Sequence, residues 1–294
     1  MTSHDAVAWA RRFLGQRRVG HAGTLDPLAA GVLVLLAGRA TGAARYFSAL
    51  PKRYRAEVIF GLETDSGDLN GVLLRRQPCP HLTPGQVEAA LAPFRGRIRQ
   101  KPPAYAAVKV GGEPAYRRAR KGEAVELPER EVEVYRLELA EWHPDPQHPR
   151  ALLEVDCSAG TYVRSLARDL GQALGTGGCL GFLLRTAVGP FSLASAWTRE
   201  ELEEARAQGR ELPLVPLAEA LSFLPAVVLD PAEARAVAAG RLPGPVGLRV
   251  RAAAAEGEAV RLLDPAGALV ATARRRGGRA ELERVFASSG GEGA

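Results

Sequence analysis

The sequence predicts an α+β fold, in which helices flank a mixed, largely antiparallel sheet and a small β-barrel-like module follows. Three observations lead to this prediction. Strand-like and helix-like patterns alternate along residues 1–225. Some of the expected strands alternate between polar and apolar side chains, whereas others are apolar throughout. The sequence pattern changes near residue 226, where short strand-like segments follow a charged, proline-bearing stretch.

Glycines separate the N-terminal elements. Ser3 is expected to cap a first helix that stops at Gly15, because apolar side chains repeat at helical spacing between them. GHAGTLDP, at 20–27, reads as a loop, and GVLVLLAG, at 31–38, reads as a strand buried on both faces. Asp26 is therefore expected on a loop that enters the core. The elements expected next are a short helix at 41–50, a strand at 53–61 and a turn-rich loop at 64–71.

The middle of the chain combines regular elements with one irregular segment. Thr83 and Gln86 form a capping-box pattern for a helix at 84–94. Residues 99–130 hold eight basic side chains among prolines and glycines, which predicts a basic insertion. The elements expected after it are strands at 131–142 and 151–158, a helix at 160–175 with Tyr162 and Arg164 in its first turn, and a strand-rich end at 180–191.

Two domains are expected, at 1–225 and 226–294. Asp230 and Pro231 indicate the start of a short helix that ends at Gly240. Short strands are expected at 248–252, 259–264 and 268–276, the last two joined by a turn. The second domain is thus predicted to be a small β-rich module.

Charge is distributed unevenly. The formal net charge is +6, but the segment from Arg11 to Arg55 holds nine basic side chains and one acidic one, Asp26. A basic segment in a nearly neutral remainder is typical of a protein that binds the phosphates of a nucleic acid. A solvated charged face is the alternative.

Several classes of protein and site are disfavoured. The longest apolar run is much shorter than the roughly 20 residues of a membrane span, and the N-terminus has no signal-peptide pattern. Three separated cysteines without a CxxC pair do not suggest a disulfide framework or a zinc site. GTGG at 175–178 lacks the strand and lysine of a phosphate loop. We expect a cytoplasmic protein that needs no metal and no nucleotide cofactor.

Asp26 is the chemically distinctive residue of the basic segment. Neighbouring positive charge favours the ionised form of a carboxylate, which can then act as a nucleophile or a base. Arg164 could hold this carboxylate with two hydrogen bonds, and Tyr54 offers a stacking face and a hydroxyl for a planar base. A turn role for Asp26 and simple burial of Tyr54 on a strand are the alternatives.

Five motifs together resemble those of the TruB family of tRNA pseudouridine-55 synthases. They are GHAGTLDPLAAGVL, KRYRAEVIFG, TDSGDLNG, CSAGTYVRSLARDLG and LLRTAVGPF, in the family's order and over most of residues 1–200. The C-terminal module similarly resembles the PUA-type RNA-binding domain of many members. The resemblance implies the pseudouridine synthase fold and an enzyme that isomerises a uridine in the T-loop of tRNA, without a cofactor, by base flipping.

The resemblance also implies roles for single residues. The family's catalytic aspartate falls on Asp26, with Arg164 as its ion-pair partner. Tyr54 is implied as a further catalytic residue, stacked under the base in a role that can extend to proton abstraction. The other implied positions, which bind RNA or line the base pocket, are His21, Asp68, Lys109, Tyr162 and Leu183. The basic insertion at 99–130 corresponds to a region that closes over the T-arm.

Two other functions stay open at this stage: a tRNA-binding folding chaperone without catalysis, and a synthase with a different RNA target. The combination of Asp26, Tyr54 and Arg164 favours the enzyme, because a pure RNA binder needs no such group. We expect a monomer that binds the T-arm of tRNA. Family members usually begin with a strand and a KPxGxTS-like motif, whereas this sequence opens at MTSHDAV, so a misassigned start or the loss of that strand is expected.

Overall fold

A computed structural model of the chain describes residues 1–103, 109–110, 113–114 and 127–286. The chain divides into two compact units. One contains residues 1–8, 22–34 and 47–196, and the other contains residues 9–21, 35–46 and 197–294. The division into domains at residue 226 stays a prediction.

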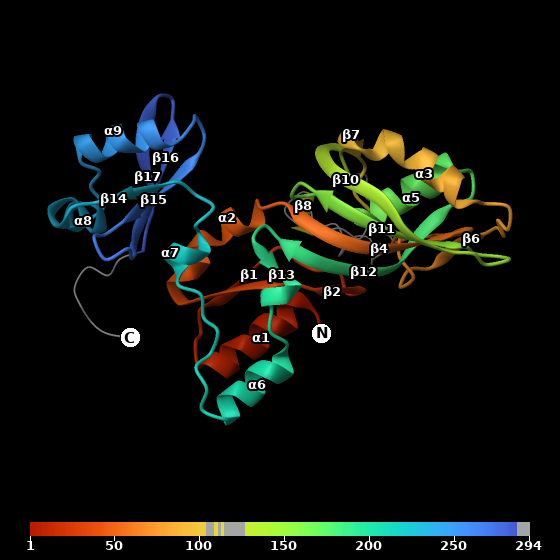
Figure 1. The fold of residues 1–294 in the computed structure, drawn as a ribbon, viewed down its shortest axis with the longest axis horizontal. Coiled ribbons are helices and arrows are strands. Elements are labelled where there is room, and N and C mark those ends of the chain that lie inside the picture. The colour runs from red at the N-terminus through yellow and green to blue at the C-terminus, as the bar shows by residue number, and fades with distance from the viewer. Residues whose placement is uncertain (104–108, 111–112, 115–126, 287–294) are drawn as a thin grey trace. The chain divides into compact units, whose positions relative to one another are not determined.

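A seven-stranded sheet forms the centre of the first unit (Figure 1). Its strand order is β13-β12-β4-β11-β10-β7, and β2 lies beside β12. The β2 and β12 strands pair in parallel, whereas the other pairs are antiparallel, which confirms the mixed, largely antiparallel sheet. The strands are β2 (Ala29–Gly31), β4 (Lys52–Phe60), β7 (Gly96–Gln100), β10 (Arg130–His143), β11 (Arg150–Cys157), β12 (Gly178–Val188) and β13 (Phe191–Ser192).

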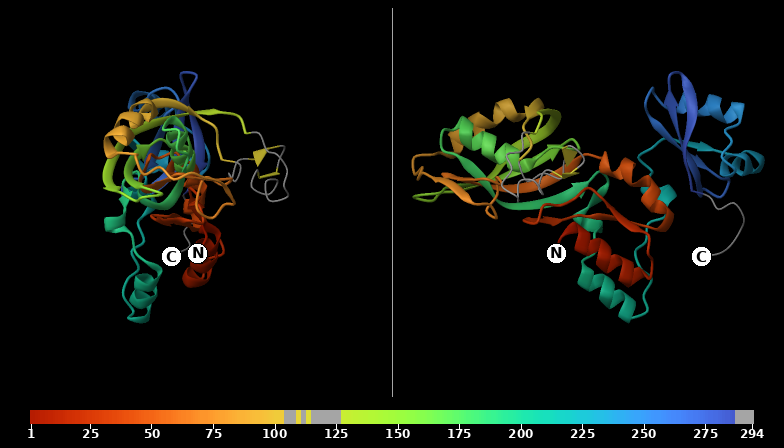
Figure 2. Two further views of the ribbon diagram at one scale, coloured as in Figure 1. Left: turned by 90° about the vertical axis from the view of Figure 1, so that its right-hand side faces the viewer. Right: turned by 180° about the vertical axis from the view of Figure 1, so that it is seen from behind.

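Two helices, α3 (Pro84–Leu91) and α5 (Val163–Ala173), lie on the same face of this sheet (Figure 1, Figure 2). Strand geometry sends alternate side chains to opposite faces, so Ala56 and Val58 on β4 are buried in the core while Arg53 and Arg55 are exposed. Thr83 caps α3 through the predicted capping box with Gln86. The core therefore lies between one sheet face and two helices.

Among the described residues, three two-stranded sheets contain further strands. They are β1 (Val19–Ala22) with β3 (Val34–Ala37), β5 (Leu62–Thr64) with β6 (Leu73–Arg76), and β8 (Lys109–Val110) with β9 (Glu113–Pro114). The rest of the predicted basic insertion, at 104–108, 111–112 and 115–126, lies outside the described residues.

Two N-terminal predictions need correction. The first helix, α1 (Ser3–Leu14), ends before Gly15 as predicted, but Thr2 rather than Ser3 caps it, since Thr2 and Asp5 exchange hydrogen bonds between backbone and side chain. The apolar run at 31–38 is not one buried strand. Gly31, with φ of 106°, ends β2, and β3 begins only at Val34. The chain turns between them, because only glycine adopts that conformation readily.

The second unit has a core of its own, formed by residues between Val227 and Val285. Its sheet has the order β14-β15-β16-β17. A four-stranded sheet with helices is what the structure describes, and barrel-like closure is not confirmed. Its elements include α6 (Arg199–Ala207), α7 (Leu217–Ala220), β14 (Ala226–Val228), α8 (Pro231–Ala238), α9 (Gly244–Ala253), β15 (Ala259–Leu263), β16 (Leu269–Arg276) and β17 (Arg279–Val285). The short helix α2 (Ala44–Ser48) begins in this unit and ends in the first.

The prediction of a strand at 248–252 is wrong, because this segment belongs to α9. Val246 and Val250 are both fully buried, and their spacing of four places them on one face of a helix. The expected connecting sequence after Thr198 also contains a helix, α6, which Thr198 caps. Within the described residues, none of the helices has the length and apolar composition needed to cross a membrane.

Candidate active site

Asp26 and Arg164 form a two-point ion pair. Arg164 lies in the first turn of α5, and its Nε and Nη2 donate to Oδ2 and Oδ1 of Asp26, both at 2.9 Å. The arginine side chain is only 5% exposed, whereas that of Asp26 is 34% exposed. The planar guanidinium therefore fixes the carboxylate plane while leaving part of the carboxylate accessible.

A second carboxylate, Asp68, lies on the other side of Arg164. The Nη1 group of Arg164 donates to the backbone oxygen of Ser66 at 3.0 Å and lies 3.7 Å from Oδ2 of Asp68. Asp68 is 4% exposed and accepts hydrogen bonds from the Ser66 hydroxyl and from the Asn70 backbone N–H. This geometry stabilises the 64–71 loop against α5, and the predicted place of Asp68 in a base pocket stays a prediction.

Tyr54 and Leu183 come from the two central strands, β4 and β12. Burial raises the pKa of Tyr54 to about 12, although the positive charge of Arg185 opposes this shift. At neutral pH the Tyr54 hydroxyl is therefore protonated and is a hydrogen-bond donor rather than a base. Leu183 is 5% exposed and pairs in register with Ala29, close after Asp26 in sequence.

Tyr162 immediately precedes α5 and is held by Gln100. The Tyr162 N–H donates to Oε1 of Gln100 at 3.0 Å, and its carbonyl accepts from Nε2 at 3.3 Å. The guanidinium carbon of Arg130 lies 5.3 Å from the centre of the Tyr162 ring. Gln100 and Arg130, which lie near the two ends of the predicted basic insertion, thus both contact Tyr162.

For two predicted residues, the described geometry gives no position relative to this site. His21 lies on β1 and belongs to the second compact unit. Lys109 lies on β8, and its side chain falls outside the described part of the chain. The RNA-binding roles of both residues stay predictions.

Sequence reasoning missed the residues that hold the Asp26 loop. The Ser3 hydroxyl accepts a hydrogen bond from the Leu25 N–H at 2.9 Å. Arg185, which is 1% exposed, donates to backbone carbonyls on both sides of Asp26. A lone arginine in the apolar run LGFLLRTAVGPF is a signal that could have identified it, because unpaired charges are rarely buried.

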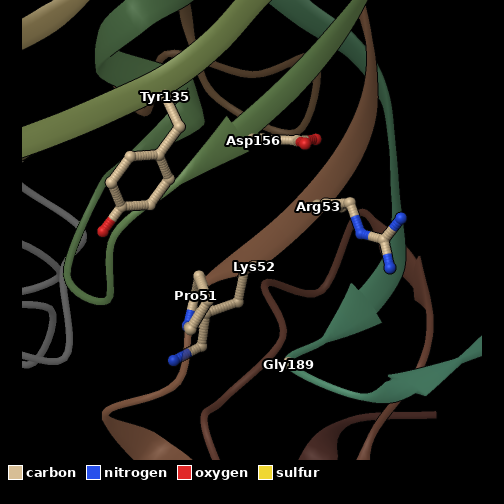
Figure 3. A pocket seen from close by; sticks show the side chains of 6 residues that line it. All are labelled: Pro51, Lys52, Arg53, Tyr135, Asp156 and Gly189. Carbon is tan, nitrogen blue, oxygen red and sulfur yellow. The ribbon is translucent and has the colours of Figure 1, made fainter.

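A shallow pocket of about 200 Å³ lies elsewhere on the same unit, as Figure 3 shows. The residues that line it are Pro51, Lys52, Arg53, Tyr135, Asp156 and Gly189. None of them is a predicted site residue, so this pocket is not assigned to the base. Among the residues that the structure describes, no group of three or more His, Cys, Asp and Glu side chains could hold a metal ion.

Family models match most of the chain. The N-terminal domain model of the TruB family of pseudouridylate synthases matches residues 11–163. The C-terminal domain model of tRNA pseudouridylate synthase B matches residues 164–231. The first match contains Asp26 and the second contains Arg164, so the ion pair joins the two matched regions.

Curated relatives match over nearly the full length. The tRNA pseudouridine synthase B of Moorella thermoacetica is 45% identical over 93% of this chain and 90% of its own length. The enzyme of the same name from Thermobifida fusca is 43% identical over 98% of this chain and 95% of its own length.

Solved structures share the fold. A chain in the crystal structure of a Cbf5-Nop10-Gar1 complex has a TM-score of 0.71 and 25% identity, with 98% of this chain and 82% of that chain covered. A chain in an H/ACA RNP bound to a substrate RNA containing 2′-deoxyuridine has a TM-score of 0.70 and 23% identity, covering 98% and 82% of the respective chains. Fold, matched regions and relatives agree, and this chain belongs to the TruB family of pseudouridylate synthases.

Proposed function

We propose that this enzyme converts one uridine in the T-loop of tRNA to pseudouridine, with Asp26 as its essential residue. The observation that carries the proposal is the ion pair between Arg164 and Asp26, in which a buried fork orients a carboxylate that is still 34% exposed. The relatives named tRNA pseudouridine synthase B support tRNA as the substrate.

The reaction breaks the bond between C1′ of the ribose and N1 of the uracil, and forms a bond between C1′ and C5. The proton that leaves C5 is balanced by the proton that N1 gains, so no oxidant, reductant or cofactor is consumed. Asp26 is the only acidic residue between Arg11 and Arg55, and its ionised oxygen can attack the nucleotide or remove a proton from it. All of these routes require the same oriented carboxylate.

The neighbouring groups suit a flipped base. Extraction of a base from an RNA loop costs a few kcal/mol, and stacking on an aromatic ring recovers about 1–3 kcal/mol. Tyr54 supplies such a ring on β4, and its protonated hydroxyl can donate to a uracil oxygen. The basic segment from Arg11 to Arg55 would contact the phosphates of the T-arm.

We propose further that the enzyme works as a monomer in the cytoplasm and that the module from residue 226 binds RNA. A separate core between Val227 and Val285 supports an independent module. Light scattering of the purified protein tests the monomer, and a gel-shift series with tRNA tests the contribution of the module.

The deciding experiment incubates unmodified tRNA with the wild-type protein and with Asp26→Asn. Release of tritium from C5 of labelled uridine measures turnover, and site-by-site mapping locates the product. Product at the T-loop uridine with the wild type alone supports the proposal. Tight tRNA binding by both proteins without product would instead support the folding-chaperone alternative, and equal modification of an unrelated structured RNA would contradict T-loop specificity.

A further inference from the structure

Arg185 is a buried cation whose hydrogen bonds go to backbone carbonyls. It lies on β12, a strand that runs between β4 and β2 in the sheet (Figure 1). Arg185 is 1% exposed. A buried guanidinium is costly unless its donors are satisfied. The carbonyls that satisfy it therefore identify what the side chain holds in place.

These carbonyls belong to the loop that carries Asp26. The Nη2 and Nη1 groups donate to the oxygens of Gly23 at 3.0 Å and Thr24 at 3.4 Å, before Asp26. The Nε group donates to the oxygen of Val32 at 2.8 Å, after Asp26. One planar side chain thus links the two ends of the loop.

The backbone of Arg185 holds the same loop. Arg185 is the register partner of Gly31 in the parallel β2–β12 pair, and its carbonyl accepts the Val32 N–H at 2.9 Å. Gly31 has φ of 106°, and a Cβ there would overlap with the Arg185 carbonyl. The loop is therefore packed against Arg185 more closely than any side chain at position 31 allows.

The other neighbour of Arg185 is Tyr54, its cross-strand partner on β4. The two side chains share one face of the sheet, where directly opposed residues interact. Arg185 is close enough to influence the pKa of Tyr54. A single guanidinium consequently lies between the loop of Asp26 and the aromatic ring proposed to bind the base.

We propose that Arg185 is a positioning residue, which holds the Asp26 loop and the Tyr54 side chain in the arrangement that the reaction needs. This inference rests on the proposed function of Asp26 and adds a residue that acts through the backbone of the Asp26 loop. It requires the fork of arginine rather than charge alone. Lysine presents its three donors from one point and cannot reach the carbonyls of Gly23 and Val32 together.

The test compares Arg185→Lys with the wild type in four measurements: kcat, tRNA affinity, melting temperature and hydrogen exchange of the peptide at 23–32. A displacement of about 1 Å at a reacting group costs roughly 100-fold in rate, so we expect kcat to fall about 100-fold while the tRNA dissociation constant changes less than about threefold. Exchange should accelerate at 23–32 and stay unchanged on β10 and β11.

Two further variants separate positioning from general destabilisation. Leu153→Val, on β11 and 3% exposed, is the matched control; it should lower the melting temperature but leave kcat and the exchange at 23–32 unchanged. Gly31→Ala disturbs the same contact from the loop side and should reproduce the Arg185→Lys result, which keeps the inference testable if Arg185→Lys does not fold.

Wild-type turnover and exchange in Arg185→Lys would overturn the inference. So would a loss of activity no larger than that of Leu153→Val at equal melting temperature. If the wild type itself forms no pseudouridine, the proposed function fails, whereas the exchange measurement still decides whether Arg185 fixes the loop. The two failures are therefore distinguishable.

Discussion

Asp26 in the first unit and Glu283 in the second unit are both bound by arginine, and the two carboxylates differ in how fully they are enclosed. Glu283 accepts hydrogen bonds from Arg274 at 2.6 Å and from the Tyr46 hydroxyl at 2.5 Å, and pairs with Arg45 at 2.9 Å. Its side chain is 10% exposed. Asp26 has both of its oxygens bound by one arginine and is 34% exposed.

We propose that this difference distinguishes a structural carboxylate, Glu283, from a reactive one, Asp26. Burial raises the pKa of Glu283, but hydrogen bonds from Arg274 and Tyr46 outweigh burial and lower it, so the group stays ionised and enclosed by donors. Asp26 is also bound, with one hydrogen bond from Arg164 to each oxygen, but its side chain stays 34% exposed. An arginine beside a carboxylate therefore does not by itself indicate catalysis. The number of donors around the carboxylate and its exposed fraction must be considered as well.

The largest expected effect is that of Asp26→Asn. The amide keeps the size of the side chain but removes the charged oxygen, and loss of a nucleophile or base commonly costs about 10⁴-fold or more in kcat. Single-turnover kinetics on unmodified tRNA measures the loss, with a dissociation constant expected within about threefold of wild type. A variant that retains a tenth of the wild-type rate would show that Asp26 is not the reacting group.

Arg164→Lys should have the next largest effect. Lysine keeps the positive charge but cannot donate to both oxygens of Asp26 and to the Ser66 carbonyl at once, so we expect kcat to fall about 100-fold. Arg164→Met also leaves Asp68 without a buried partner, which should lower the free energy of unfolding by about 3–5 kcal/mol. Urea denaturation distinguishes these two outcomes, and equal stability of both variants would contradict the ion-pair network.

Whether the sequence could predict a residue of this site depends on whether its side chain binds another side chain or a backbone group. Asp26 and Arg164 were predicted because five ordered motifs place them together and their side chains complement each other. Arg185 and Ser3 were missed because they bind backbone groups, at Gly23, Val32 and Leu25, and no residue pattern names a backbone partner. Positions that hold a loop are therefore the harder half of a site to predict.

The fold shows the same limit. Alternation predicted β10 and β11, and the Thr83 box predicted the start of α3. The segment LRVRA also alternates, yet it belongs to α9, because Val246 and Val250 are buried four residues apart. In a segment of five residues, the spacing of apolar side chains does not distinguish the strand period of two from the helical period. The distinction requires knowing which positions are buried.

Glu283→Gln tests whether Glu283 contributes to stability and not to turnover. The amide cannot accept as strongly from Arg274 and Tyr46, and its NH₂ group faces donors, so the free energy of unfolding should fall by about 1–3 kcal/mol. Turnover of tRNA should stay within about twofold of wild type. Thermal melts and kcat measured on the same samples test both statements; a large loss of kcat at unchanged stability would mean that the two carboxylates do not differ in the way proposed.

The smallest expected effect concerns Lys52, a buried cation of the first unit. Its ammonium donates to the carbonyls of Ser48 and Leu50, and its side chain leaves β4 in a different direction from that of Arg53 (Figure 3). Burial, reinforced by the charge of Arg185, lowers the pKa of Lys52 to about 8 from an ordinary value of 10.5. Between these pH values the unfolded chain holds a proton that the folded chain has released, so the Lys52 contribution to the free energy of unfolding should rise with pH, by at most about 1.4 kcal/mol per pH unit.

Lys52→Met removes this titration, and the wild type should therefore gain stability relative to the variant between pH 8 and pH 10. Burial raises the pKa of the neighbouring Cys157 to about 11. That shift has the opposite sign, because stability from a buried neutral thiol is lost as pH rises toward the folded value. The contribution of Lys52 is measured in a Cys157→Ala background. The melting temperatures of Cys157→Ala and of Cys157→Ala with Lys52→Met are compared across the pH range. A difference that stays flat or falls with pH would mean that Lys52 keeps its proton, and then the carbonyls of Ser48 and Leu50 stabilise the ammonium more than burial and Arg185 oppose it.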